Sequence, residues 1–95
     1  MLLLGASRTQ VKIVSSRARD ISAVILSRVD RGVTLLHGEG GYTHNPVEIV
    51  MSVISSRELV KLQRLVQEID PQCFMIVSKV TEVHGRGFSF SKHAE

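Results

Sequence analysis

The residues from Val47 to Val83, VEIVMSVISSRELVKLQRLVQEIDPQCFMIVSKVTEV, carry the signals that decide the fold. The β-branched run Val47–Ile54 is typical of a strand. Ser55-Ser56-Arg57-Glu58 follows it and matches a capping box, in which the Ser55 hydroxyl accepts a backbone N–H and the Glu58 carboxylate accepts another. A helix is therefore expected to begin directly after this strand.

The same stretch also shows where the helix ends. Asp70-Pro71 stops it, because the residue before a proline is disfavoured in helical angles. Phe74–Val83 is then expected to form the last strand. Between the capping box and Asp70, apolar residues recur at helical spacing and form a stripe for burial: Leu59, Leu62, Leu65, Val66 and Ile69.

The N-terminal half repeats the pattern of strand, helix and strand. Ser16 is the expected N-cap of a helix over Arg17–Asp30, and Gly32 is expected to end it. A turn-rich segment, Gly38–Pro46, leads on to the strand at Val47. The remaining expected elements are the strands Gln10–Val14 and Val33–His37, and the helical stripe of Ile21, Val24, Ile25 and Val29.

The resulting order is β-α-β-β-α-β. With right-handed connections this order predicts an α+β, ferredoxin-like fold, a four-stranded antiparallel sheet with both helices on one face. We expect one domain over residues 10–88, an N-terminal linker over 1–9 and a polar tail over 89–95.

Composition places the chain among ordinary globular domains, with 43% hydrophobic and 22% charged residues. The apolar run Leu2–Leu4 is far shorter than the roughly 20 residues that span a bilayer. The single cysteine, Cys73, fits a reducing compartment. We therefore expect a soluble, cytoplasmic domain.

Positive charge is concentrated in the N-terminal third of the chain. Residues 1–31 contain six Lys and Arg and two Asp, whereas residues 32–95 contain six cations and seven acids. A basic segment can serve nucleic acid or an anionic membrane surface, and it can equally be a solvated helix face.

Two strands carry apolar residues on both faces, which a sheet with one solvated face does not need. Either subunits associate through the face without helices, or exposed aliphatic residues are tolerated there. We assign Val50 and Met75 to the face away from the helices. The alternating sets are Val47, Ile49, Met51 and Val53 against Val50 and Ile54, and Phe74, Ile76 and Val80 against Met75, Val77 and Val83.

No motif predicts catalysis, a metal site or a cofactor. Gly38-Glu39-Gly40 does not open a helix and so is no dinucleotide fingerprint. Arg86-Gly87-Phe88-Ser89-Phe90 resembles an RNA-recognition signature but lies outside the strand that would need it, so nucleic acid is not expected as a partner. Cys73 has no evident activating partner. The histidines share no metal-ligand spacing, although His37 and His84 could approach each other: His37, His44, His84 and His93.

An ordered set of short motifs resembles the C-terminal cytoplasmic domain of YitT-family bacterial membrane proteins. The resemblance implies a parent with transmembrane helices and a position at the cytoplasmic face of the membrane, and it covers roughly residues 10–88. The motifs are Arg31-Gly32-Val33-Thr34, Gly38-Glu39-Gly40 with Tyr42-Thr43, Ser56-Arg57-Glu58, Glu68-Ile69-Asp70-Pro71 with Phe74, Glu82-Val83, and Gly85-Arg86-Gly87-Phe88.

The same domain resembles the nitrogen-regulatory PII signal proteins, which are trimers that bind nucleotides between subunits. The resemblance implies a homotrimer and an anionic small-molecule ligand at the seam between subunits. The chain departs from PII proteins in its shorter loop and in lacking a glycine-rich phosphate cradle. Glycines allow close approach of the backbone, hydroxyls donate hydrogen bonds, and cations can neutralise an anion. The expected ligand-binding residues are therefore Arg31, Gly38, Gly40, Tyr42, Thr43, Arg57 and Arg86.

Two functions remain open at this stage. The first is a non-enzymatic regulatory or ligand-sensing domain of a bacterial membrane protein. The alternative is a purely structural oligomerisation module without a ligand.

Overall fold

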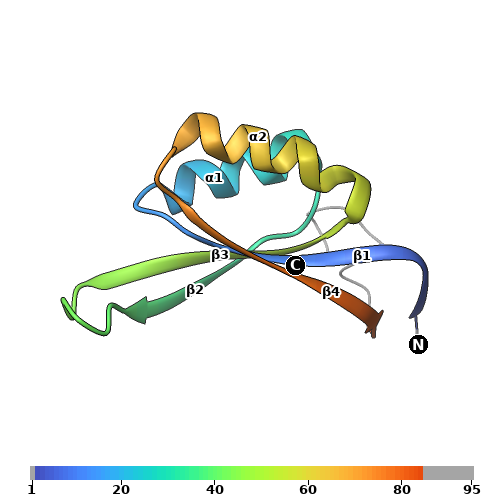
Figure 1. The fold of residues 1–95 in the computed structure, drawn as a ribbon, viewed down its shortest axis with the longest axis horizontal. Helices are drawn as coiled ribbons and strands as arrows, with labels where there is room; N and C mark the ends of the chain where they lie inside the picture. The colour runs from blue at the N-terminus through green and yellow to red at the C-terminus, as the bar shows by residue number, and fades with distance from the viewer. Residues whose placement is uncertain (1, 85–95) are drawn as a thin grey trace.

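The computed structural model describes the backbone of residues 2–84 and the side chains of residues 8–81 and 84. One layer of helices lies on one face of a four-stranded sheet (Figure 1). The strand order is β2-β3-β1-β4, and all neighbouring pairs are antiparallel. The elements are β1 (Leu2–Val14), α1 (Ala18–Val24), the π-helix η1 (Ile25–Val29), β2 (Thr34–Glu39), β3 (Pro46–Ser55), the 3-10 turn η2 (Ser56–Glu58), α2 (Leu59–Ile69) and β4 (Phe74–Val83).

This arrangement confirms the predicted α+β, ferredoxin-like fold. β1 and β2 are joined through α1 and η1 and are separated in the sheet by β3. The second unit, β3-α2-β4, places β4 on the other side of β1. Both connections cross the same face, so α1 and α2 share one layer (Figure 1).

Element boundaries differ from expectation mainly at the N-terminus. β1 begins at Leu2 rather than Gln10, so strand structure takes in most of the residues expected to form a linker. β4 spans Phe74–Val83, as predicted. None of the helices within residues 2–84 combines the length and the apolar character needed to cross a bilayer.

The first helix begins differently from the prediction. Its N-cap is Arg17, not Ser16, and no side chain caps it. The Ser15 hydroxyl instead accepts the N–H of Arg17 at 2.9 Å and donates to Asp70 Oδ2 at 2.5 Å. Ser15 therefore joins the loop before α1 to the loop after α2.

The second helix forms as its sequence predicts. The capping box is present, with the Ser55 N–H donating to Glu58 Oε1 at 2.8 Å. Leu62 and Val66 of the stripe are fully buried, and the other stripe residues pack against the same core. Asp70 is extended, with φ −144°, and ends the helix.

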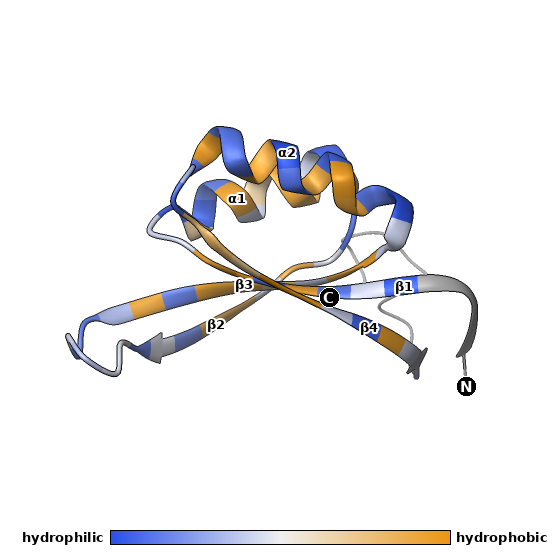
Figure 2. Cartoon of the chain, in the orientation of Figure 1, coloured by the Kyte–Doolittle hydropathy of each residue, from blue (hydrophilic) through white to orange (hydrophobic). Residues whose placement is uncertain are grey.

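The core lies between the sheet and the helices. Figure 2 shows apolar residues along the middle of the strands and on the helix faces turned toward them. Burying this many aliphatic side chains supplies the main driving force for folding. The buried apolar residues are Val11, Ile13, Ala18, Ile21, Ile25, Val29, Val50, Ile54, Leu62 and Val66.

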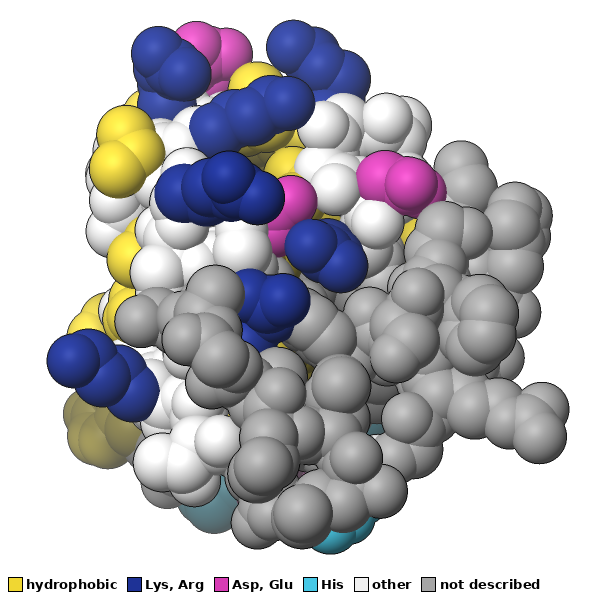
Figure 3. All heavy atoms as spheres, turned by 90° about the vertical axis from the view of Figure 1, so that its right-hand side faces the viewer, with side chains coloured by type: hydrophobic (Ala, Val, Ile, Leu, Met, Phe, Trp, Pro, Cys, Tyr) yellow, Lys and Arg dark blue, Asp and Glu magenta, His cyan; other side chains and the backbone are white. Residues whose placement is uncertain are grey.

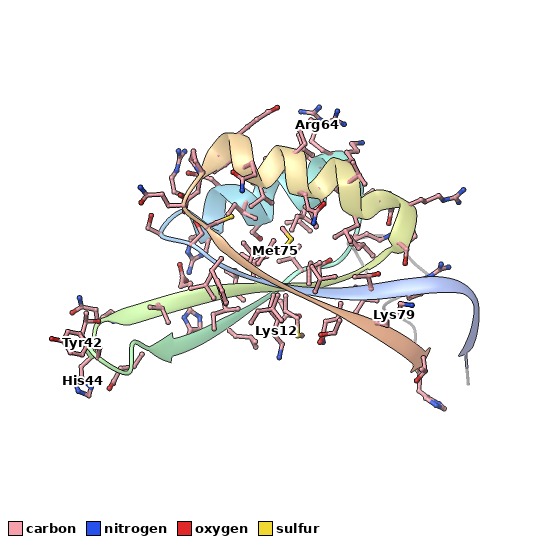
Figure 4. All side chains as sticks on the ribbon, in the orientation of Figure 1. Lys12, Tyr42, His44, Arg64, Met75 and Lys79 are labelled. Carbon is pink, nitrogen blue, oxygen red and sulfur yellow. The ribbon has the colours of Figure 1, made fainter. Side chains whose placement is uncertain are left out.

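The assignment of Val50 and Met75 to the face away from the helices is wrong. Val50 is fully buried in the core, and Met75 packs against that core between sheet and helices (Figure 4). The sequence pattern was ambiguous because β3 carries aliphatic residues on both faces. The antiparallel pairing of Val50 with the buried Ile13 decides which set meets the helices.

The β2–β3 hairpin extends beyond the rest of the sheet (Figure 1). β1 ends at Val14, opposite Ile49, whereas β3 begins three residues earlier at Pro46. Residues 46–48 of β3 therefore pair with β2 on one side and have no β1 partner on the other.

Candidate functional site

The face of the sheet away from the helices, called the open face below, carries a continuous apolar surface. Because side chains alternate along a strand, residues paired across the sheet share a face. Val14 pairs with Ile49 and Phe74, and Ile49 pairs with Leu36, which makes an apolar row across all four strands. The open face comprises Val14, Leu36, Val47, Ile49, Met51, Val53, Phe74, Ile76 and Val80.

Several of these side chains are strongly exposed. Phe74 keeps 62% of its surface in contact with solvent, and Ile76 keeps 43%. Exposed single apolar residues are normal, but a contiguous set on one sheet face is typical of an interaction surface.

One lysine lies in the middle of this apolar surface. Lys12 pairs with Met51 on β3 and with Ile76 on β4, and it projects away from the helices (Figure 4). Its neighbour on the same strand face, Gln10, donates from Nε2 to Met51 Sδ at 3.5 Å. A partner that covers this face must therefore accommodate the positive charge of Lys12.

Four of the predicted ligand-binding residues lie on the β2–β3 hairpin. Gly38 pairs with Val47 near the end of β2, and Tyr42 is 95% exposed at the tip (Figure 4). The Thr43 hydroxyl accepts the N–H of Asn45 at 3.2 Å. A Cβ on Gly40 would lie 2.8 Å from Thr43 Oγ1, so a glycine keeps this turn free of a clash.

The predicted cations lie elsewhere. Arg31 Nε donates to Glu58 Oε1 at 3.2 Å, and Arg57 is exposed in η2. Both residues lie near the Ser55 end of β3, whereas the hairpin tip adjoins its Pro46 end. Ten strand residues span about 30 Å, so one chain does not bring the two groups together. Arg86 lies outside the described residues.

A groove of about 570 Å³ lies at the base of the hairpin, between the ends of β1 and α2 and the start of β3. Its charged lining residues are Glu48 and Asp70. The hydrogen bond from Ser15, and a second from the Gln72 N–H, hold the pKa of Asp70 below its usual range. The groove therefore carries negative charge and does not suit an anion.

The three described histidines lie apart from one another and form no metal site. His37 lies on β2 and His84 follows β4, and these are opposite edges of the sheet, so the two histidines do not approach each other. His44 Nδ1 lies 2.7 Å from Glu39 Oε2 in the hairpin. Within the described residues, no three His, Cys, Asp or Glu side chains cluster to hold a metal ion. His93 lies outside those residues.

Cys73 shows no sign of activation. Burial, together with the nearby Asp70 charge, raises the pKa of its thiol. A raised pKa keeps the thiol protonated, which is the opposite of what a nucleophilic cysteine needs.

Sequence reasoning missed the polar links that hold the groove side of the molecule together. Arg17 Nη1 donates to the Ile69 carbonyl at 3.1 Å, and Arg19 Nη2 contacts Glu48 Oε2 at 2.9 Å. These pairs are 52 and 29 residues apart in sequence. No local spacing signals such contacts, and only the crossing of α1 over the sheet creates them.

Comparisons with known proteins agree with the fold. The family described as "Uncharacterized protein conserved in bacteria (DUF2179)" matches residues 31–85. A solved structure of a DUF2179 protein from Eubacterium ventriosum superimposes with a TM-score of 0.66 at 42% identity, covering 75% of this chain and 97% of that one.

Two Bacillus subtilis membrane proteins of the UPF0750 group are similar in sequence. YpjC is 38% identical over 89 residues, or 94% of this chain and 31% of its own length. YitT is 32% identical over 73 residues, or 77% of this chain and 26% of its own length. The chain thus spans about a third or less of these relatives. The chain belongs to the DUF2179 family, and its domain is one found in the YitT family of bacterial membrane proteins.

Proposed function

We propose that this chain is a non-enzymatic assembly domain of a bacterial membrane protein, lying on the cytoplasmic side and associating with copies of itself through the open face. The apolar row from Leu36 to Phe74 across all four strands is the observation that carries the proposal. Within the described residues, the helices lie over the opposite face and leave the open face uncovered (Figure 1).

The size of the open face supports an interface. Four strands at normal spacing, over the length that carries the apolar residues, present roughly 500 Å². This is near the upper end of the largest apolar patch on a typical monomer, about 300–600 Å². It also approaches the roughly 600 Å² per partner at the lower end of specific interfaces.

Lys12 favours a particular kind of assembly. Two open faces stacked about a two-fold axis at their centres would oppose two Lys12 ammonium groups in an apolar layer, which is unfavourable. An offset, cyclic arrangement avoids that contact and lets each Lys12 reach water or an acidic group of the next copy. A trimer is the smallest such ring, and it is the state we propose.

A regulatory role would come from a ligand held between copies. The hairpin residues Tyr42 and Thr43 and the cations Arg31 and Arg57 lie at opposite ends of β3, so only two different chains could bring them to one anionic small molecule. A thermal-shift screen of nucleotides and metabolites tests this role, because a ligand that binds the folded state raises its melting temperature. Under this proposal, Tyr42→Phe weakens binding of any hit. If the oligomer is purely structural, no compound in the screen raises its melting temperature.

The assembly proposal has a matched pair of test variants on one strand. Ile76 and Val77 are adjacent on β4 and are 43% and 44% exposed, but they point to opposite faces. We expect Ile76→Asp to convert the oligomer to a monomer, because it places a carboxylate in the interface. Val77→Asp is expected to leave the oligomer intact.

Size exclusion with light scattering at micromolar concentration measures the outcome. A wild-type mass near 10.5 kDa would overturn the proposal. So would equal loss of assembly in both variants, because that pattern points to unfolding rather than to a specific face.

A further inference from the structure

Positive charge is gathered at one end of the molecule, the end where η1 finishes and α2 begins. Figure 3 looks onto this end and shows Lys and Arg side chains spread over the helices and the sheet edge. The residues are Arg8, Arg28, Arg31, Arg57, Lys61, Arg64 and Lys79, with Asp30 and Glu58 as the acids among them. We call these seven cations the basic end.

The rest of the described surface has the opposite balance. It carries three cations, Lys12, Arg17 and Arg19, against five acids, Asp20, Glu39, Glu48, Glu68 and Asp70. Two of those cations are neutralised locally, since Arg17 pairs with Asp20 at 2.8 Å and Arg19 with Glu48 at 2.9 Å. The described part of the chain therefore has a positive end, and its remaining surface carries a small excess of negative charge.

Most cations of the basic end are not used inside the fold. Arg28, Arg57, Arg64 and Lys79 are exposed and form no ion pair with another described residue. Lys61 Nζ donates to the Arg28 carbonyl at 2.9 Å, which ties the start of α2 to the end of η1. These cations lie on helices and a strand, and their positive charge is available to attract an anionic partner.

The spacing along η2 and α2 presents three of the cations together. Arg57, Lys61 and Arg64 follow one another at intervals of four and three residues, so they share a helix face. Lys79 lies at the level of the sheet, on the edge strand β4, and Arg64 lies on the outer side of α2 (Figure 4). A broad surface of like charge is suited to a broad anionic partner rather than to a small enclosed ligand.

We propose that the basic end binds the anionic headgroup surface of a lipid bilayer. The inference rests on the membrane setting in the proposed function, which the names of the UPF0750 relatives support. Each Lys or Arg close to an anionic bilayer adds attraction, so the exposed cations of the basic end can together orient the whole domain. These are Arg28, Arg57, Lys61, Arg64 and Lys79. The described aromatic residues, Tyr42 and Phe74, lie on the hairpin and the open face, which leaves the basic end without the stacking groups of single-stranded nucleic-acid sites.

Co-sedimentation with vesicles tests the proposal on the 95-residue protein. We expect binding to vesicles of phosphatidylcholine with phosphatidylglycerol, no binding to phosphatidylcholine alone, and loss of binding as salt is added. The double variant Arg57→Gln, Arg64→Gln should bind on the order of 30-fold more weakly. Arg57→Lys, Arg64→Lys should restore binding.

The matched control removes the same charge from the other end. Arg17→Gln, Arg19→Gln should weaken binding far less, and circular dichroism checks that both double variants remain folded. Equal weakening by the two variants, or equal binding to neutral vesicles, would overturn the proposal. Displacement of the protein from vesicles by duplex DNA at matched charge would overturn it in favour of a nucleic-acid surface.

Light scattering on the same samples separates this proposal from the previous one. A monomer that binds anionic vesicles through Arg57 and Arg64 supports the basic end and refutes assembly. An oligomer that does not bind anionic vesicles supports assembly and refutes membrane binding by the basic end.

Discussion

At the scale of single residues, Glu58 shows how one side chain joins local and distant structure. Its Oε1 accepts the Ser55 N–H at 2.8 Å and the Arg31 Nε–H at 3.2 Å. Burial acts to raise the pKa of this carboxyl, but hydrogen bonds from Ser55 and Arg31 outweigh burial and hold the pKa below its usual 4.5. The carboxylate thus both caps α2 and anchors the segment that follows η1.

This lowered pKa predicts acid sensitivity. A carboxyl whose folded-state pKa is depressed stabilises the fold fully above its unfolded pKa, and that contribution disappears as pH falls through the folded pKa. We expect Glu58→Gln to lower the free energy of unfolding by about 0.5–1 kcal/mol at neutral pH, and by progressively less as the pH falls from 4.5 through the lower pKa of the folded state. Urea denaturation across pH measures this.

Glu68→Gln is the control, because it removes the same charge from an exposed position on α2. If the difference between wild type and Glu58→Gln is constant with pH, the carboxylate does not act through its charge.

At the scale of elements, the end of the first helix departs most from a regular pattern. α1 widens into the π-helix η1 at Ile25, and the Asp30 N–H donates to the Ile25 carbonyl at 2.9 Å. The Ser27 hydroxyl donates to the Ala23 carbonyl at 2.9 Å, and such side-chain bonds compete with the helical ladder. The chain then leaves the helix through Asp30, whose φ of 57° is left-handed.

The left-handed residue gives an element-scale prediction. Glycine adopts this conformation without the steric penalty of a Cβ, whereas alanine does not. We expect Asp30→Gly to be more stable than Asp30→Ala by about 1 kcal/mol. Thermal or urea denaturation of the two variants measures the difference. Equal stabilities would mean that residue 30 is not left-handed in solution.

At the scale of the whole molecule, three surfaces face in different directions. The helices cover one face of the sheet, the open face lies opposite, and the basic end lies where α2 begins (Figures 1 and 3). The hairpin projects past β1 at the other end. One copy can therefore contact a neighbour through the open face while the basic end contacts a bilayer.

Self-association also predicts how stability depends on concentration. An oligomer that loses its contacts on unfolding melts at a higher temperature as protein concentration rises. For a domain of this size we expect a shift of roughly several degrees over a wide concentration range. Differential scanning calorimetry measures it, and Ile76→Asp should melt at a temperature independent of concentration. A concentration-independent wild type would argue against assembly.

Local sequence signals determined the order of elements in this protein. The capping box at Ser55, the stripe on α2 and the stop at Asp70-Pro71 each depend on residues within a few positions of one another. The order β-α-β-β-α-β, with the usual right-handed crossovers, then leaves the ferredoxin-like sheet as the natural arrangement. The hairpin residues of the candidate site were also predicted to lie together, because they are contiguous in sequence.

Only the tertiary structure decided which residues of each strand face the helices and which lie on the open face. β3 is apolar on both faces, so the alternation of side chains could not show which face meets the helices. The pairing of β3 with β1 and the crossing of the helices decide it. Val50 faces the helices, and Met51 lies on the open face. The separation of Arg57 from Tyr42 and the charge difference between the two ends arise in the same way. Side chains far apart in sequence are gathered or parted by the path of the chain, and no local pattern records that path.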